Sequence, residues 1–148
     1  MTSEITQKII IKNFDRLDEI LQSYPIIRQR YKNLSAENFA AQVKQMIELD
    51  NFKMVGAFLD DKIIGVAGYS ISHMLYCGRY LQISSFIVDE KSRGLGVGKK
   101  ILSEVEKIAK ELACEKLVLE SYSENKKSHA LYFRENFYIR GFHFMKDL

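Results

Sequence analysis

The sequence predicts an α+β fold in which helices cover both faces (α/β/α layers) of a mixed, mostly antiparallel sheet. Three strand-like runs joined by short turns near the middle of the chain predict an antiparallel meander. A strand, helix, strand pattern follows, and a crossover of this length implies that its two strands are parallel neighbours. A chain of 148 residues with 47% apolar content suits a single domain over 1–148 with a sizeable core.

The first fifty or so residues predict one strand and two helices. Lys8–Lys12 alternates weakly and predicts the strand, while Phe14–Leu21 has apolar residues at helical spacing. Pro25 interrupts this first helix, and Ile26–Tyr31 is a candidate for its continuation. Ser35 opens the second helix. The apolar face of that helix is formed by Phe39, Val43, Met46 and Ile47.

The meander is predicted from three runs that follow this region. They are Lys53–Leu59, Lys62–Ile71 and Arg79–Val88, with an acidic turn at 60–61 between the first two. The helix Val97–Leu112 then has apolar residues at three and four residue spacings, so it is expected to pack on the sheet.

The end of the chain predicts two more strands and one more helix. Lys116–Glu120 is expected to be a short buried strand, parallel to the strand before the long helix. Ser128–Glu135 is expected to form the last helix, and Gly141–Lys146 a terminal strand. Neither repeats nor a linker interrupt this order.

The glycine-rich stretch at 93–98 is the most informative motif, because it lies between a predicted strand and a predicted helix. Glycine frees backbone amides there, and the first N–H groups of the helix converge on the same place, so the loop can hold a phosphate. Arg93 and Lys99 flank it with positive charge.

The spacing of the glycines excludes two familiar phosphate loops. Gly94 and the Gly98-Lys99 pair enclose three residues where a Walker loop needs four, and Lys100 follows where Ser or Thr is needed. Gly96 and Gly98 are separated by one residue where a dinucleotide fingerprint needs two. What remains is Arg-x-x-Gly-x-Gly, which resembles the pyrophosphate-binding signature of the GNAT superfamily of acyl-CoA-dependent N-acyltransferases.

The resemblance extends from about Phe52 to Leu148. Residues 88–102 look like the central motif of that family, and Asn125 followed by Ala-Leu-Tyr-Phe at 130–133 looks like the next one. Asn136 stands where the family usually has glycine before phenylalanine. Asparagine tolerates the left-handed backbone that ends a helix, so this departure is compatible with the motif.

This resemblance implies a GNAT fold, in which the central parallel strand pair splays apart and the pantetheine arm of acetyl-CoA lies in the gap. A strand N–H there can stabilise the oxyanion formed from the thioester. The strand residues are also expected to be buried sheet residues. The positions implied to bind acetyl-CoA are Phe86, Ile87, Val88, Arg93, Gly94, Leu95, Gly96, Val97, Gly98, Lys99 and Asn125.

Two residues of the second motif have roles implied by the resemblance. Tyr132 matches the tyrosine that protonates the leaving thiolate, and a phenol holds its proton at neutral pH. The alternative is that Tyr132 only packs on an amphipathic helix. Asn125 matches an asparagine that contacts the cofactor arm, or it is only a helix cap or turn former.

The general base is harder to place, because many relatives have a glutamate on the strand where this chain has Ser84 and Ser85. Serine cannot deprotonate an ammonium. Glu120 is the best carboxylate candidate and His73 the second; a water chain or a neutral substrate is the remaining possibility.

The acceptor site is implied to lie in the first part of the chain, where relatives use their first two helices. Arg28, Arg30 and Tyr31 are candidates for orienting a substrate, or solubilising residues on a helix surface. Tyr69 and Tyr76 are candidates for the opposite wall.

The charge and composition indicate the partners. A net charge of +3 with dispersed basic residues does not favour nucleic acid. It suits a polyanionic cofactor, with the lysine pairs 99–100 and 126–127 either near its phosphates or on plain solvated helix faces. We expect a monomer or a homodimer.

The remaining sequence features indicate a cytoplasmic protein. Cys77 and Cys114 are too few for a disulfide framework and are expected to be reduced, and no metal-ligand spacing appears. Neither a signal peptide nor a membrane span is expected, because polar residues precede only a three-isoleucine run near the start.

Three hypotheses follow. The first is an N-acetyltransferase that moves an acetyl group from acetyl-CoA to a primary amine of a small molecule or a peptide, by direct attack in a ternary complex. The second is a non-catalytic acyl-CoA sensor, which the missing strand glutamate supports. The third is an unrelated nucleotide-phosphate binder, against which the pattern from Asn125 to Phe137 argues.

Overall fold

The computed structural model describes residue 4 and residues 8–148. It forms two compact units, residues 1–118 and 119–148, which are described here one at a time. The expectation about a signal peptide rests partly on residues outside the described ones. Within the described part of the chain, no helix is both long enough and apolar enough to cross a membrane.

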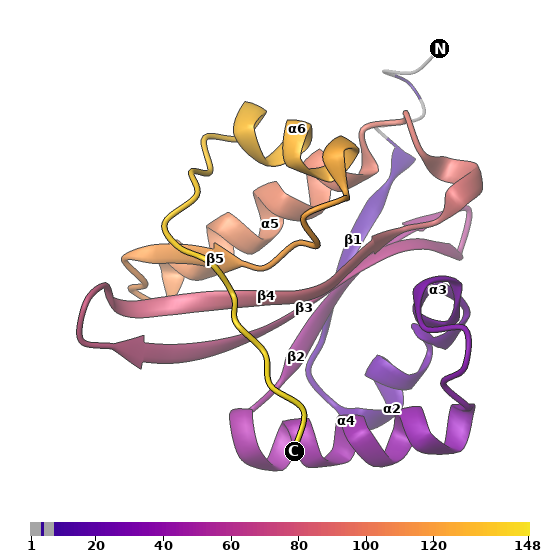
Figure 1. Ribbon diagram of the computed structural model, residues 1–148. Helices are drawn as coiled ribbons and strands as arrows, with labels where there is room; N and C mark the ends of the chain where they lie inside the picture. Colours follow the sequence, from indigo (N-terminus) through magenta and orange to yellow (C-terminus); the bar gives the residue numbers. More distant parts are fainter. Residues whose placement is uncertain (1–3, 5–7) are drawn as a thin grey trace. The chain divides into compact units, whose positions relative to one another are not determined.

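A five-stranded mixed sheet organises the first unit. Its strand order is β1-β2-β3-β4-β5, so the strands follow the chain (Figure 1). The first four are antiparallel neighbours, and β4 and β5 form the parallel pair that the sequence predicted. The strands are β1 (Ile10–Phe14), β2 (Lys53–Leu59), β3 (Lys62–Met74), β4 (Gly78–Val88) and β5 (Lys116–Leu119).

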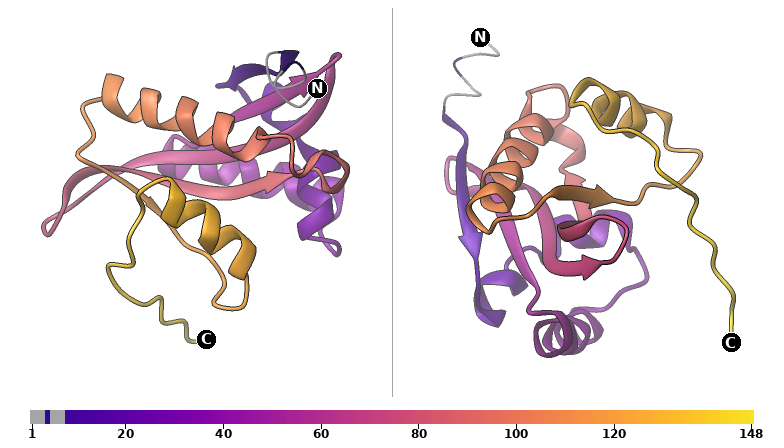
Figure 2. Two further views of the ribbon diagram at one scale, coloured as in Figure 1. Left: turned by 90° about the horizontal axis from the view of Figure 1, so that it is seen from above. Right: turned by 90° about the vertical axis from the view of Figure 1, so that its left-hand side faces the viewer.

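Helices cover both faces of this sheet, as the sequence predicted. Figures 1 and 2 show α5 on one face and the helices that precede β2 on the other. The latter are α2 (Leu17–Leu21), α3 (Tyr24–Arg30) and α4 (Ala36–Asp50), and α5 is Val97–Glu111, preceded by the 3₁₀ turn η1 (Glu90–Ser92). The α+β prediction is therefore confirmed.

Pro25 separates two short helices, as predicted, but it does so from inside the second one. It occupies the first turn of α3, where the missing N–H of proline would have no helical partner in any case. The break falls at Ser23, whose buried hydroxyl donates to the Ile20 carbonyl at 2.6 Å. After this break, α3 packs against β3 and β4.

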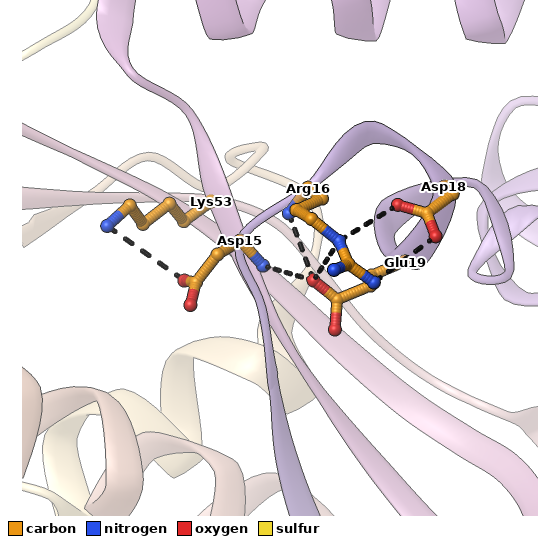
Figure 3. A network of polar contacts seen from close by, with 5 residues as sticks. All are labelled: Asp15, Arg16, Asp18, Glu19 and Lys53. Carbon is orange, nitrogen blue, oxygen red and sulfur yellow. Dashed lines mark hydrogen bonds and ion pairs between the residues drawn. The ribbon is translucent and has the colours of Figure 1, made fainter.

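A surface network holds the start of α2 against the end of β1 (Figure 3). Glu19 Oε1 accepts the backbone N–H of Asp15 at 3.3 Å and that of Arg16 at 3.1 Å, which satisfies two donors at the helix start. The Arg16 guanidinium reaches Asp18 at 3.3 Å, and Lys53 lies 3.9 Å from Asp15. These ion pairs are exposed and contribute little, so the backbone bonds are the ordering element.

The core between the sheet and the helices α2–α4 is formed by apolar side chains from all of these elements. β2 supplies buried residues from both of its ends, and Ile87 comes from the far end of β4. The buried members are Phe14, Ile20, Ile26, Ile27, Phe39, Val43, Phe52, Met54, Phe58, Val66 and Ile87.

On the opposite face, α5 packs closely on β3 at Gly65, where an added side chain would press on two residues of the helix. A Cβ built on Gly65 would lie 2.9 Å from Ile101 Cδ1 and 3.1 Å from Val97 Cγ1. Val97 and Ile101 are fully buried on the first turns of α5. Gly65 therefore sets the position of the N-terminus of α5.

We expect Gly65→Val to lower the free energy of unfolding by about 1–3 kcal/mol, because the added methyl groups overpack this contact. Denaturant unfolding followed by circular dichroism measures the change. Ser72→Val, on an exposed position of the same strand, is the control and should stay within about 0.5 kcal/mol of the natural protein. Equal stability of the two variants would contradict the close packing.

The C-terminal unit contains α6 (Lys126–Arg134), close to the predicted helix. The helix ends as the sequence predicted, with Asn136 at φ 68°. The N–H of Asn136 donates to Phe133 at 3.1 Å and that of Phe137 to Tyr132 at 2.9 Å, which is the Schellman pattern. The rings of Phe137 and Tyr132 also pack together, with centroids 5.8 Å apart.

Two predictions for the end of the chain are wrong. Gly141–Lys146 forms no strand within the described residues, and Phe142 and Phe144 are 84% and 92% exposed. Alternating apolar residues form a strand only when an edge is available to pair with them, and local sequence does not report this. β5 is also less buried than predicted, since Lys116 is exposed and its other residues are half-buried, and it ends before Glu120.

Candidate active site

A β-bulge interrupts β4 just before the predicted cofactor-binding residues. Val66 pairs with Ile87 and Gly68 pairs with Ser84, so two residues of β4 face the single residue Ala67. The first of the two, Ser85, has φ 49°, an uncommon conformation for a residue other than glycine. A bulge bends its strand and increases the twist, so the last residues of β4 leave the line of the first ones.

The parallel strand β5 accompanies only the first half of β4. Glu115 N–H donates to the Arg79 carbonyl at 2.7 Å, which fixes the entry to β5 beside the start of β4. Because β5 has four residues and β4 has eleven, Ser84–Val88 extends past the end of β5. β4 therefore continues beyond β5, as expected for a parallel pair whose strands separate toward one end.

The predicted phosphate loop connects β4 to α5 and has the required backbone geometry. Gly94 and Gly96 have φ 83° and 80°, a region that glycine enters without steric cost. Gly96 is the N-cap of the fifteen-residue helix α5, and no side chain caps that end. A Cβ on Gly94 would meet no atom within 4 Å, so its surface is open to a ligand. These features fit a pyrophosphate, which backbone N–H groups and the helix dipole would stabilise.

The other predicted loop residues divide between anchoring and exposed positions. Val97 is fully buried and fixes the loop to the core, whereas Arg93 and Lys99 are exposed. Lys100 is turned elsewhere, because its Nζ donates to the Ile9 carbonyl at 2.7 Å. The expectation that Lys100 lies near the phosphates is therefore not supported. Of the remaining predicted residues, Ile87 is buried, Gly98 lies in the first turn of α5, and Phe86, Val88 and Leu95 are half-buried.

A glutamine that the sequence did not single out ties α3 to the start of this loop. Gln29 Nε2 donates to Asp89 Oδ1 at 2.7 Å, and its Oε1 accepts the Glu90 N–H at 3.2 Å. The second oxygen of the buried Asp89 accepts from Ser92 Oγ at 3.4 Å. Gln29 and Asp89 are 60 positions apart, so no local spacing could have indicated the contact.

We expect Gln29→Ala to lower the free energy of unfolding by about 1–2 kcal/mol, because Oδ1 of the buried Asp89 loses the hydrogen bond from Gln29. Thermal and denaturant unfolding measure this change. Gln22→Ala, on an exposed position between α2 and α3, is the matched control and should have no measurable effect. If both variants behaved alike, Gln29 would have no role in holding the loop.

An apolar cavity of about 240 Å³ lies between α3, α4 and the sheet, beside the bulge of β4. Tyr31 and Ser85 mark its polar end, with their hydroxyl oxygens 3.4 Å apart. Of the acceptor-site residues predicted in and just after α3, Tyr31 lines this cavity and Arg28 and Arg30 do not. The lining residues are Ile27, Tyr31, Leu34, Phe39, Gln42, Val43, Met46, Phe52, Met54 and Ser85.

The two tyrosines predicted for the opposite wall are elsewhere. Tyr76 is exposed in the turn between β3 and β4. Tyr69 lines a separate, more polar cavity of about 270 Å³ together with residues such as Lys53 and Arg79. Burial, and to a lesser extent the Asp15 and Glu104 carboxylates, raise the pKa of Tyr69 to about 12. Tyr69 therefore keeps its proton throughout the neutral range.

His73, the second candidate for the base, lies far from the loop along the sheet. It is exposed and pairs with Arg79, near the start of β4. The loop follows Val88, at the other end of that strand. At about 3.3 Å per residue, the two ends are roughly 30 Å apart. His73 is therefore too far from the loop to act as a general base there.

The C-terminal unit carries the other predicted catalytic and binding residues. Tyr132 is half-buried on α6, with its ring held by Phe137. Asn125 is the N-cap of α6, but its side chain makes no capping hydrogen bond, so the cap alternative is not supported. Glu120 Oε2 pairs with His143 Nδ1 at 2.8 Å, and both side chains are about half exposed.

The described residues contain no group of three potential metal ligands. Cys77 and Cys114 are free cysteines, and each is partly buried.

Comparison with known families and structures agrees with this geometry. Residues 14–137 match the model of the acetyltransferase (GNAT) family. The chain belongs to this family, since the match covers most of its length and runs through both the glycine loop and α6. None of the curated proteins compared with the chain matches it.

Solved structures share the fold at low sequence identity. One is an aminoglycoside acetyltransferase from an uncultured soil metagenomic sample, in complex with trehalose, at 18% identity and TM-score 0.80, covering 97% of this chain and 99% of that one. Another is an aminoglycoside N-acetyltransferase in complex with CoA, at 18% identity and TM-score 0.78, covering 95% of each chain. A third is glucosamine-6-phosphate N-acetyltransferase from Arabidopsis thaliana, at 18% identity and TM-score 0.71, covering 94% and 97%. The GNAT fold is therefore the one the sequence predicted.

Proposed function

We propose that this protein transfers an acetyl group from acetyl-CoA to a primary amine, by direct attack within a ternary complex. The observation that carries the proposal is the loop at 93–98, where two glycines with positive φ and the N-terminus of α5 form an open phosphate cradle. The bulged end of β4 leads directly into this cradle, so one ligand can occupy both.

The cofactor contacts follow from this arrangement. Backbone groups of Gly94 to Gly98 hold the diphosphate, with Arg93 and Lys99 adding positive charge at the surface. The pantetheine arm lies along the end of β4, Phe86 to Val88, and hydrogen-bonds to its backbone as an added strand would. Asn125, whose side chain is not used as a helix cap, contacts the arm from the C-terminal unit.

Bound acetyl-CoA supplies an acyl carbon to the amine nitrogen: the C–N bond forms, the C–S bond breaks, the thiolate gains a proton and the amine loses one. Tyr132 provides the proton for the thiolate through its phenol group. The Phe137 contact and the Schellman turn hold the tyrosine ring in one orientation, which suits a positioned acid. A backbone N–H near the end of β4 stabilises the developing oxyanion.

Glu120 is the proposed carboxylate that takes the amine proton. Its Oε2 lies 2.8 Å from His143 Nδ1, so the histidine holds the carboxylate in position. The strand position usually occupied by glutamate carries Ser84 and Ser85 here. Glu120→Gln should therefore slow turnover most for strongly basic amines.

The experiment that tests the proposal is calorimetric titration with CoA, followed by thiol release from acetyl-CoA with a panel of primary amines. Binding with amine-dependent thiol release supports the enzyme. Binding without release across the panel would favour the alternative, a non-catalytic acyl-CoA sensor. Failure of CoA to bind would refute both functions.

We also propose that the protein acts in the cytoplasm as a monomer or homodimer, on an amine of a small molecule or a peptide and without nucleic acid or membrane partners. The two free thiols suit a reducing compartment. The dispersed basic residues suit a small anionic co-substrate better than nucleic acid.

A further inference from the structure

We infer that the amine acceptor is a monoamine with an apolar body, such as an arylalkylamine or alkylamine, and that it binds in the cavity between α3, α4 and β4. The inference rests on the proposed function, since it identifies the acceptor for that reaction. It is carried by the chemistry of the cavity lining and by the position of Ser85 at one end of it.

The cavity has an apolar interior and a small polar end. Seven of its ten lining residues have apolar side chains. The polar ones are Tyr31, Gln42 and Ser85, and none of the ten carries a carboxylate. The buried floor is formed by Ile27, Val43, Phe52 and Met54, from both helices and the sheet.

This lining discriminates between classes of amine. A polycation placed here would lose water without gaining a counter-ion, and burying an unpaired charge is costly. An aryl or alkyl group would instead replace water on apolar surface and gain about 25 cal/mol for each Å² that it buries. The volume of about 240 Å³ suits one such group rather than a multi-ring sugar.

The polar end of the cavity points the acceptor nitrogen toward the bulge. Ser85 lies on β4 just before the proposed cofactor-binding residues, and its Oγ is 3.4 Å from Tyr31 OH. These two hydroxyl groups can hydrogen-bond an amino group while the apolar body occupies the rest of the cavity. The nitrogen is then next to the strand segment that receives the thioester.

The apolar lining of the cavity also affects how much the reaction needs a general base, the role for which the strand glutamate is missing here. A buried amine without a counter-ion favours its neutral form, and only the neutral form has the lone pair that attacks. An acceptor bound in this cavity therefore needs less help from a general base. Ser84 and Ser85 at the usual glutamate position are consistent with such an acceptor.

The first experiment compares 2-phenylethylamine and hexylamine with spermidine and neamine, at saturating acetyl-CoA and with thiol release as the signal. We expect kcat/KM to be about tenfold or more higher for the two monoamines. A preference for the polycations, or no turnover of the monoamines by a protein that binds CoA, would overturn the inference.

The second experiment fills the cavity. Met46→Trp should raise KM for 2-phenylethylamine about tenfold, while KM for acetyl-CoA changes by less than about twofold. Leu49→Trp is the matched control, because Leu49 is on the same helix, 82% exposed and outside the lining. Equal KM values for 2-phenylethylamine in the two variants would place the acceptor elsewhere.

A third variant changes a residue outside the hydrophobic core, so it should not affect folding. Gln42 is an exposed residue at the mouth of the cavity, so Gln42→Glu adds a carboxylate without repacking. The ratio of kcat/KM for spermidine to that for 2-phenylethylamine should rise about threefold or more, because the new charge attracts the polycation. An unchanged ratio would contradict the cavity as acceptor site.

The outcomes separate this inference from the proposed function. Loss of CoA binding in calorimetry would refute the function itself. CoA binding with preferred turnover of polycations would leave the function intact and refute only the apolar acceptor.

Discussion

Gly96→Val should weaken CoA binding about 30-fold or more, which corresponds to about 2 kcal/mol. Gly96 has φ 80°, and a β-branched residue is strained there, so the loop must move away from its present geometry. The phosphate cradle depends on that geometry, since backbone N–H groups rather than side chains form it. Calorimetric titration with CoA measures the change in Kd.

The control for this variant is Gly141→Val. Gly141 has open space around the position of a Cβ, and its φ lies outside the left-handed region. This variant should bind CoA as the natural protein does. If folded Gly96→Val kept full affinity for CoA, the diphosphate would not be bound by this loop.

Tyr132→Phe should lower the rate of acetyl transfer about 100-fold or more, with the Kd for CoA changed by less than about twofold. A positioned general acid contributes roughly 10²–10⁴ to the rate, and phenylalanine removes only the hydroxyl. The ring contact with Phe137 is kept. Single-turnover kinetics with saturating amine measures the chemical step directly.

Tyr138→Phe is the matched control, because Tyr138 belongs to the same C-terminal unit and is 67% exposed. Its single-turnover rate should equal that of the natural protein. A Tyr132→Phe rate within about threefold of normal would leave the thiolate to be protonated by another group.

The fold was largely predictable from the sequence, because its signals are local. The acidic turn at 60–61 adopts positive φ at both residues, as a tight turn between antiparallel strands requires. Ser35 caps α4 by accepting the Asn38 N–H at 3.1 Å. Asn136 ends α6 in the left-handed conformation, as expected of an asparagine in the place of glycine.

The predictions that were wrong concern features that depend on distant partners. The run Gly141–Lys146 has the alternation of a strand, but pairing needs an edge that the run itself cannot supply. Tyr69 was predicted to line the acceptor site, but it lines a different cavity. Which cavity it lines depends on how the end of α4 and the end of α5 pack around it.

The sequence by itself determined the family, the order of helices and strands as far as α6, and the glycine loop, because propensity, capping and glycine spacing all act over a few residues. Only the tertiary structure decided that β4 bulges at Ser85, that Gln29 holds Asp89 across 60 positions, and that the cavity beside Ser85 has a mostly apolar lining without carboxylates. These features arise where residues remote in the chain meet. Their energies depend on packing and burial, which have no counterpart in local sequence.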